Sequence, residues 1–188
     1  MCGRYALFDT TKTNIKIAND IIRKNYNVTP SEMVPVVLDN YEVELIRWTF
    51  KVPWAKKLNI INARSETLEK KKIFQSSKRC IFIANGYFEW LSWGKTKVPY
   101  YHTYKNKMMY FGGVFNDFGG CIVTRQSYPR EVDVHHRQPV ILNHDDFDRW
   151  FAFEHDFSCE QSSHMSIYEV SDRVNSPCNN SEENIQPA

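Results

Sequence analysis

The first residues of the chain, Met1-Cys2-Gly3, include a side chain that could act as a nucleophile. Because Cys2 is small, we expect removal of the initiator Met, which would leave an α-amine and a thiol on one residue. An α-amine has a pKa of about 7.7–8.0, so part of it is neutral and nucleophilic at pH 7. An amine and thiol so placed convert an aldehyde first to an imine and then to a thiazolidine ring. The alternative is that Cys2 is an ordinary small residue in a frayed terminus.

A second polar group follows the apolar pair Ile60-Ile61. Arg64 could bind a phosphate through both arms of its guanidinium group. Asn62 could form a hydrogen bond next to a reacting group. The alternative is that this segment begins a helix, with Asn62 or Ser65 as its cap and Glu66 in its first turn.

A carboxylate, Glu89, lies between Phe88 and Trp90 at the end of an apolar segment. Burial among aromatic rings raises the pKa of a carboxyl group and suits it to proton transfer near neutral pH. The alternative is an outward-facing side chain on an alternating strand.

The adjacent residues His135 and His136 provide a further acid or base. On an extended chain they point in opposite directions, so only one of them can serve a given site. The alternative is a polar surface loop. The five cysteines include no Cys-X-X-Cys pair, and the sequence groups no other ligands around the histidines, so we expect neither a metal nor another cofactor.

The overall charge of the 188-residue chain, +2, is too small for a protein that coats nucleic acid by charge alone. A nucleic-acid site would therefore have to be a local groove. Aromatic residues next to basic ones are typical of single-stranded DNA binding, where bases stack on the rings. Most of these aromatic residues are nevertheless expected in the core. The tryptophans with basic neighbours are Trp48, Trp54, Trp90 and Trp93.

The elements that would position these residues can be read from apolar periodicity and turn residues. The sequence predicts two helices: one after Thr10 or Thr11 with Ile15, Ala18, Ile21 and Ile22 on one face, and one capped by Asn143 or Asp145 that carries Phe147, Trp150 and Phe151. It predicts a hairpin from Val34 to Phe50 around Asp39-Asn40, and one strand from Arg79 to Trp90 followed by a turn at Gly94 and a returning strand from Val98 to Tyr104. Further strands are predicted at Met108–Phe115, Cys121–Thr124, Pro139–Leu142 and Tyr168–Val174.

Many strands with two helices predict a single α+β domain on a curled, mainly antiparallel sheet. We expect this domain to span residues 1–175, with residues 176–188 forming a loose polar tail. Apolar residues make up 42% of the chain, enough for a core, and no run approaches the length of a membrane helix. Without a recognisable signal peptide, the chain is expected to be a soluble intracellular protein, located in the cytoplasm or the nucleus.

Taken together, five segments resemble the SOS response-associated peptidase (SRAP) family over residues 2 to 175. They are Cys2-Gly3-Arg4-Tyr5, Tyr26-Asn27-Val28-Thr29-Pro30, Ile61-Asn62-Ala63-Arg64-Ser65-Glu66-Thr67, Gly86-Tyr87-Phe88-Glu89-Trp90 and His135-His136-Arg137-Gln138-Pro139-Val140-Ile141-Leu142, in the family's order.

The resemblance implies an α+β fold with a barrel-like sheet and a covalent crosslink to abasic DNA. It implies that Cys2 is the nucleophile, that Asn62 is the active-site Asn, and that Glu89 and His135 serve as acid and base. It further implies that the DNA-binding residues are Arg4, Arg64, Pro30, Trp54 and Trp90, with Lys72 in place of a common Arg.

We therefore expect a monomeric, single-turnover protein that crosslinks through Cys2 to the aldehyde of an abasic site in single-stranded DNA, with possible lyase-type activity and no cofactor. Two alternatives remain at this point. One is a cysteine peptidase or amidase that uses Cys2, acting only on its own N-terminus. The other is a non-covalent reader of single-stranded or modified DNA.

Overall fold

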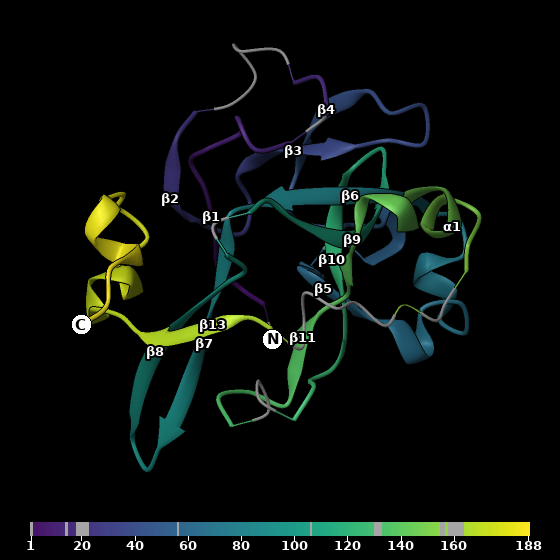
Figure 1. Cartoon of the computed structure of the whole chain (residues 1–188). Coiled ribbons are helices and arrows are strands. Elements are labelled where there is room, and N and C mark those ends of the chain that lie inside the picture. The colour runs from purple at the N-terminus through teal and green to yellow at the C-terminus, as the bar shows by residue number, and fades with distance from the viewer. Residues whose placement is uncertain are drawn as a thin grey trace.

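The structure is a computed structural model that describes residues 2–13, 15–17, 23–55, 57–105, 107–129, 133–154, 157 and 164–188. Its strands form two mainly antiparallel sheets (Figure 1). The five-stranded sheet has the order β13-β8-β7-β1-β2, and the eight-stranded sheet has the order β11-β10-β9-β6-β3-β4, with β12 paired to β9 and β5 to β10. The β5–β10 pair is parallel. The strands are β1 (Tyr5–Leu7), β2 (Asn25–Val28), β3 (Met33–Val37), β4 (Val43–Arg47), β5 (Asn62–Arg64), β6 (Lys78–Ala84), β7 (Gly86–Trp93), β8 (Thr96–Thr103), β9 (Met109–Asn116), β10 (Gly119–Gln126), β11 (Arg137–Pro139), β12 (Ile141–Leu142) and β13 (Ser166–Glu169).

The α+β class is confirmed, but the expected barrel is wrong. Each sheet keeps two edge strands, β13 and β2 in one and β11 and β4 in the other, so neither closes on itself. Helical content is also smaller than expected, because the described residues contain a single α-helix, α1 (Phe147–Phe151). No helix among those residues is long and apolar enough to cross a membrane. Short 3-10 turns are η1 (Pro53–Ala55), η2 (Ser65–Thr67), η3 (Lys72–Phe74), η4 (His144–Asp146), η5 (Asp172–Asn175) and η6 (Glu182–Ile185).

The predicted strand from Arg79 to Trp90 is wrong, because the chain changes sheets at Asn85. The Asn85 side chain accepts hydrogen bonds from the backbone N–H groups of Phe8 and Asp9, at 2.7 and 3.0 Å. It also donates to the Asp9 carbonyl at 2.8 Å. A Cβ on the next residue, Gly86, would lie 2.5 Å from the backbone oxygen of His102, so a side chain has no room there. Apolar composition continues through this change of sheet and does not reveal it.

The hairpins predicted from alternating residues are confirmed. β3 and β4 pair from Met33↔Arg47 to Val37↔Val43 around the predicted turn. β7 and β8 pair across Gly94, whose φ of 61° suits a residue without a side chain. The predicted strands before and after Gly119-Gly120 form β9 and β10.

The helix predicted after Asn143 is also confirmed. Asn143 and Asp146 form a reciprocal capping box on η4, which leads into α1. The expected Pro139–Leu142 strand is divided between β11 and β12. The helix expected after Thr10 or Thr11 falls largely on residues 18–22, outside the described residues.

The C-terminal segment differs from expectation in two respects. β13 ends at Glu169, and the rest of the predicted Tyr168–Val174 strand turns into η5. Residues 176–188 are polar but not loose: the Asn27 side chain donates to the carbonyls of Ser176 and Asn179, at 2.9 and 2.7 Å. The division of the chain after residue 175 stays a prediction.

Aromatic residues in the core hold β1 against β7. Tyr5 and Tyr87 are cross-strand partners, and both rings pack against Phe111 in a T-shaped arrangement, with centroids 6.5 and 5.8 Å away. Tyr5 also packs on the buried Trp48 at 5.1 Å. These contacts hold the strand that carries Glu89 beside the strand that follows Cys2.

Candidate active site around Cys2

Cys2 is fully buried where the N-terminal segment meets β7. The Phe88 N–H donates to the Arg4 carbonyl at 2.9 Å, which continues the β1–β7 pairing toward Cys2. Burial, and then the negative charge of Glu89, raise the pKa of the Cys2 thiol well above its ordinary value. The thiol is therefore protonated near neutral pH in this arrangement.

Asn62 holds the backbone of Cys2. Its side-chain Nδ2 donates to the Cys2 carbonyl at 2.8 Å. Asn62 begins β5, which pairs in parallel with β10 opposite Ile122 and so fixes its direction. The buried Oδ1 of Asn62 accepts no hydrogen bond within the described part of the chain. A buried acceptor of this kind has capacity for an N–H or O–H group that enters the site.

Glu89 is 3% exposed on β7, opposite Tyr100 of β8. Removal from water raises the pKa of this carboxyl group to about 7. A group with that pKa exists in both protonation states near neutral pH, which suits it to give and take a proton in successive steps. Because Glu89 also raises the pKa of Cys2 by its charge, the two side chains are within electrostatic range.

His135 lies two residues before the start of β11, with its ring stacked on His136 at a centroid distance of 4.4 Å. The expectation that the two rings point in opposite directions is wrong, because the chain bends at His136 instead of being extended there. Nδ1 of His135 lies 3.0 Å from the Arg137 backbone nitrogen and 3.1 Å from the Arg137 carbonyl oxygen, so it accepts from one or donates to the other according to the tautomer. Partial burial lowers the pKa of His135 to about 4, which keeps the ring neutral near pH 7.

The sequence analysis did not identify His102 of β8, which is 1% exposed. Its ring stacks on Tyr87, its cross-strand partner, at 4.5 Å with an interplanar angle of 17°. Burial lowers the pKa of His102 to about 4, and the charge of His135 acts in the same direction. The signal that could have found it is a histidine within the predicted Val98–Tyr104 strand, since a neighbouring aromatic strand would bury one face.

A paired charge fixes the segment after Asn62 to the strand after His135. The guanidinium of Arg137 donates from both terminal nitrogens to Glu66, at 2.6 and 3.0 Å. These hydrogen bonds hold the pKa of Glu66 down at about 2. The two predicted motifs are therefore joined in space.

Of the predicted DNA-binding residues, Arg4 and Trp90 have partners within the protein. One terminal nitrogen of Arg4 donates to the Asn27 side chain at 2.7 Å and to the Val174 carbonyl at 2.6 Å. Trp90 donates to Asn175 at 2.7 Å. The Arg4 guanidinium also lies 5.9 Å from the centre of the Trp90 ring. These contacts give Arg4 and Trp90 a structural role, and their DNA role stays a prediction.

The other four predicted DNA-binding residues are exposed or partly exposed. Trp54 is 68% exposed on η1, and Lys72 is exposed on η3. Pro30 is partly exposed before the turn into β3. Arg64 is exposed and lies two residues after Asn62, so both point to the same face of β5. The structure thus joins Asn62 to the Cys2 backbone by a hydrogen bond and places Glu89 where its charge acts on the Cys2 thiol, while the DNA-binding roles of these four residues stay predictions. Among the described residues, no three His, Cys, Asp or Glu side chains gather as a metal site would require.

The sequence of the chain matches a known protein family. The sequence profile of the SOS response associated peptidase (SRAP) family matches residues 1–177, so the chain belongs to that family. It is 33% identical to the abasic site processing protein YoqW of Bacillus subtilis (strain 168), covering 99% of each chain. It is 27% identical to the abasic site processing protein YedK of Escherichia coli (strain K12), covering 100% of each. A solved protein structure from Bacteroides thetaiotaomicron has the same fold, with a TM-score of 0.71, 23% identity, and coverage of 90% of this chain and 88% of that one.

Proposed function

We propose that this protein crosslinks itself to abasic sites in single-stranded DNA through Cys2, after removal of Met1. The observation that carries the proposal is the convergence on one residue: Asn62 holds the Cys2 backbone while Glu89 acts on its thiol. The relatives named above are abasic site processing proteins, which supports the same substrate.

In the proposed reaction, the α-amine of Cys2 attacks the C1′ aldehyde of the ring-opened sugar and forms a carbinolamine. Loss of one water molecule gives an imine, and Glu89 donates the proton that lets hydroxide leave as water. The carbinolamine nitrogen keeps its proton, so the imine is formed as an iminium ion. The thiol then gives its proton to the ionised Glu89 and adds to the iminium carbon, which closes the thiazolidine. One aldehyde and one Cys therefore give one ring and one water.

The order of these steps follows from the raised pKa of the Cys2 thiol. Because the thiol is protonated, the amine is the first nucleophile, and the thiol reacts only when a base can take its proton. Glu89, left ionised by the first step, is that base. The neutral ring of His135 provides a hydrogen-bond partner for the sugar oxygen.

Asn62 orients the reacting groups in this proposal. Its Nδ2 already holds the Cys2 carbonyl, and its buried Oδ1 is available for the amine or the carbinolamine hydroxyl. Holding amine and aldehyde together replaces a bimolecular encounter, a gain that reaches about 7–11 kcal/mol in well-aligned cases. The flanking DNA is bound by Arg4 and Arg64 at phosphates and by the remaining DNA-binding residues, Pro30, Trp54, Lys72 and Trp90.

The test is a denaturing gel of the mature protein incubated with single-stranded DNA that contains one abasic site. We expect a shifted band that persists in denaturant. Cys2→Ala should abolish it, whereas Cys178→Ser, a change at an exposed cysteine, should leave it unchanged. Mass spectrometry should find Cys2 as the first residue, and a mature chain that begins with Met1 would contradict the proposal.

The wild-type and Cys2→Ala proteins also distinguish the crosslinking activity from the two alternative functions. A peptidase that uses Cys2 would turn over peptides without DNA, and a non-covalent reader would bind DNA equally well as the Cys2→Ala variant. We propose that any peptidase action is confined to the protein's own N-terminus, that any lyase-type activity is secondary to the crosslink, and that the protein acts once, as an intracellular monomer.

A further inference from the structure

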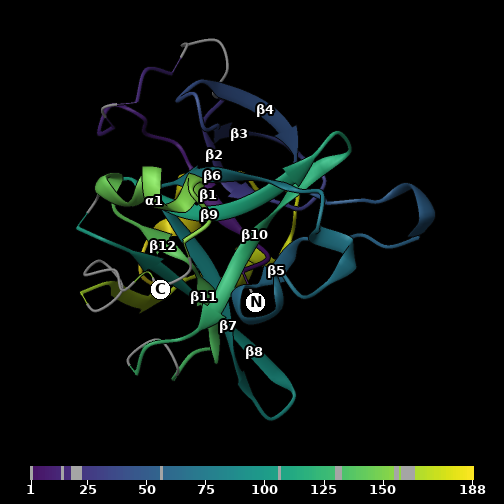
Figure 2. The same cartoon turned by 90° about the vertical axis from the view of Figure 1, so that its right-hand side faces the viewer.

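The hairpin formed by β7 and β8 extends beyond the sheet that contains it (Figures 1 and 2). β7 and β8 pair with each other from Tyr87↔His102 to Trp93↔Thr96. Their outer neighbours cover only the inner half: β1 pairs with β7 at Gly86 and Tyr87, and β13 pairs with β8 at 100–103. Residues 91–98 therefore form a two-stranded arm.

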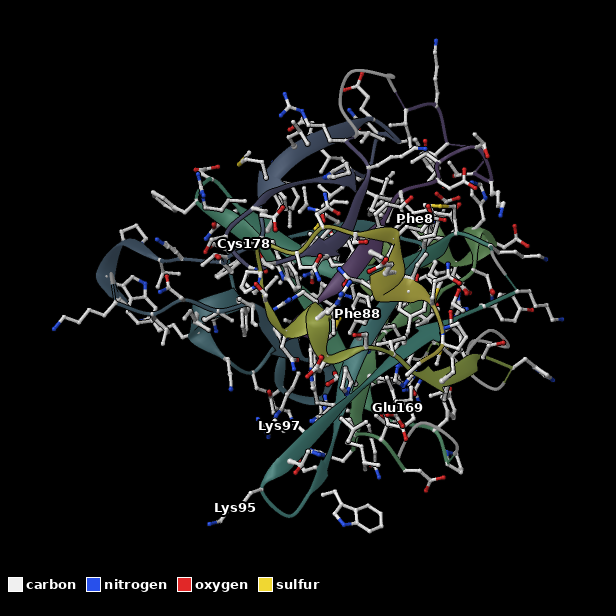
Figure 3. All side chains as sticks on the ribbon, turned by 90° about the vertical axis from the view of Figure 1, so that its left-hand side faces the viewer. Phe8, Phe88, Lys95, Lys97, Glu169 and Cys178 are labelled. Atoms are coloured by element: carbon white, nitrogen blue, oxygen red, sulfur yellow. The ribbon has the colours of Figure 1, made fainter. Side chains whose placement is uncertain are left out.

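The tip of this arm carries a tryptophan that packing does not explain. Trp93 is 77% exposed, more than the other large hydrophobic residues described as exposed. Gly94, with φ of 61°, makes the turn, and the exposed Lys95 and Lys97 follow it. Figure 3 shows Lys95 at the end of the arm and Lys97 slightly nearer the body. An exposed indole next to a turn that carries an ammonium group suits a base and its phosphate.

The arm is continuous with the candidate active site. Side chains alternate along a strand, so Glu89 and Trp93, four residues apart on β7, point to the same face. At about 3.3 Å per residue, they are roughly 13 Å apart along the strand. With about 3.4 Å per nucleotide in a stacked strand, that distance spans about four nucleotides, and fewer in an extended strand.

We propose that the tip of the β7–β8 arm is a second DNA contact: Trp93 stacks on an unpaired base two to four nucleotides from the abasic site, and Lys95 in the turn binds an adjacent phosphate. Lys97 pairs with Ser92 and so lies on the opposite face of the arm from Trp93. This inference rests on the proposed function and extends it by setting a minimum length of single strand. The occupant is single-stranded because only an unpaired base offers its face to an indole at a hairpin tip.

A second exposed aromatic at a hairpin tip supplies a matched comparison. Phe118 is 52% exposed in the two-residue turn between β9 and β10, but its neighbour is Asp117. An aromatic ring beside a carboxylate lacks the positive charge that a phosphate backbone requires. Phe118→Ala therefore removes an exposed ring without removing the proposed contact.

The experiment measures how the crosslinking rate depends on DNA concentration, for strands with one or with six nucleotides on either side of the abasic site. With the longer strand, Trp93→Ala should raise the half-saturating DNA concentration by about 5- to 150-fold, the range for one lost base stack. The maximal rate should not change, because Trp93 does not touch the reacting atoms. Phe118→Ala should match the wild type, and with the shorter strand all three proteins should agree.

The charge contribution is tested by salt. Replacing Lys95 by Gln should lower the slope of log affinity against log salt by about 0.7, the contribution of one phosphate contact to a single strand. The same change at Lys105, beyond the opposite end of β8, is the control. An equal change of slope in both variants would overturn the charge assignment.

The inference is overturned if Trp93→Ala and Phe118→Ala shift the half-saturating concentration equally, or if the loss appears only with a duplex flank. Failure of the proposed function is recognised separately, because the wild type would then form no adduct. In that case, binding of an intact single strand to the Cys2→Ala protein still reports on Trp93. A urea unfolding midpoint unchanged by Trp93→Ala shows that the arm variant is folded.

Discussion

Replacing Glu89 by Gln should make the protein more stable at high pH and leave its stability unchanged at low pH. Glu89 is 3% exposed, and burial raises its pKa from the ordinary 4.5 to about 7. Between these two values the folded protein binds more protons than the unfolded chain, so the free energy of unfolding falls as the pH rises. Gln has the same shape and no charge, so the variant lacks this fall.

The magnitude follows from the two pKa values. A tenfold difference in proton affinity corresponds to about 1.4 kcal/mol. A carboxyl group that changes from 4.5 in the unfolded chain to about 7 in the folded protein therefore costs about 3 kcal/mol once it is ionised in both states. The difference in stability between variant and wild type should be small at pH 4 and about 3 kcal/mol at pH 8.

Urea unfolding followed by tryptophan fluorescence at pH 4, 6 and 8 measures this difference directly. Other groups that titrate in this range, such as His102 and His135, contribute equally to both proteins and cancel. The matched control, Glu169→Gln, changes an exposed carboxylate on β13 and should alter stability by less than about 0.5 kcal/mol at either pH. A stability difference for Glu89→Gln that is the same at pH 4 and pH 8 would refute the argument from burial.

Three further predictions concern the residues that support the site. His102→Phe should remove an acid-sensitive part of stability: burial lowers the pKa of His102 to about 4, so the contribution of His102 to the free energy of unfolding should fall by about 3 kcal/mol from pH 7 to pH 4, and in urea titrations the variant should gain that amount relative to the wild type over this range. Asn27→Ala should cost about 2–3 kcal/mol, because it removes the acceptor of Arg4 and the donor to the carbonyls of residues 176 and 179; limited proteolysis should then cut after Val174. Gly86→Ala should destabilise the fold by more than 2 kcal/mol in thermal unfolding, because its Cβ would overlap the backbone of β8. The control Gly94→Ala has no atom within 4 Å of its Cβ and should cost only its backbone strain, of order 1 kcal/mol.

The hairpins were predictable because their evidence is local. The alternation of apolar and polar residues and the positions of turn residues determine which parts of 33–47 and 96–124 are strands. Both signals lie within a few residues of the element that they predict. The break at Asn85 was not predictable, because it depends on hydrogen bonds to Phe8 and Asp9, far away in the sequence. The polar C-terminal segment looked loose because its partner, Asn27, lies about 150 residues earlier.

The sequence alone determined the candidate chemistry of this protein. A nucleophile, a hydrogen-bond acceptor, an acid and a base can be identified from residue type alone, because functional groups are properties of side chains. These residues are Cys2, Asn62, Glu89 and His135. Only the tertiary structure decided that Glu89 is buried with a pKa of about 7, that Asn62 holds the Cys2 carbonyl, and that Arg4 and Trp90 bind the C-terminal segment. The physical reason is that pKa values and hydrogen-bond partners depend on what surrounds a group in space, and strand pairing between distant segments sets those surroundings.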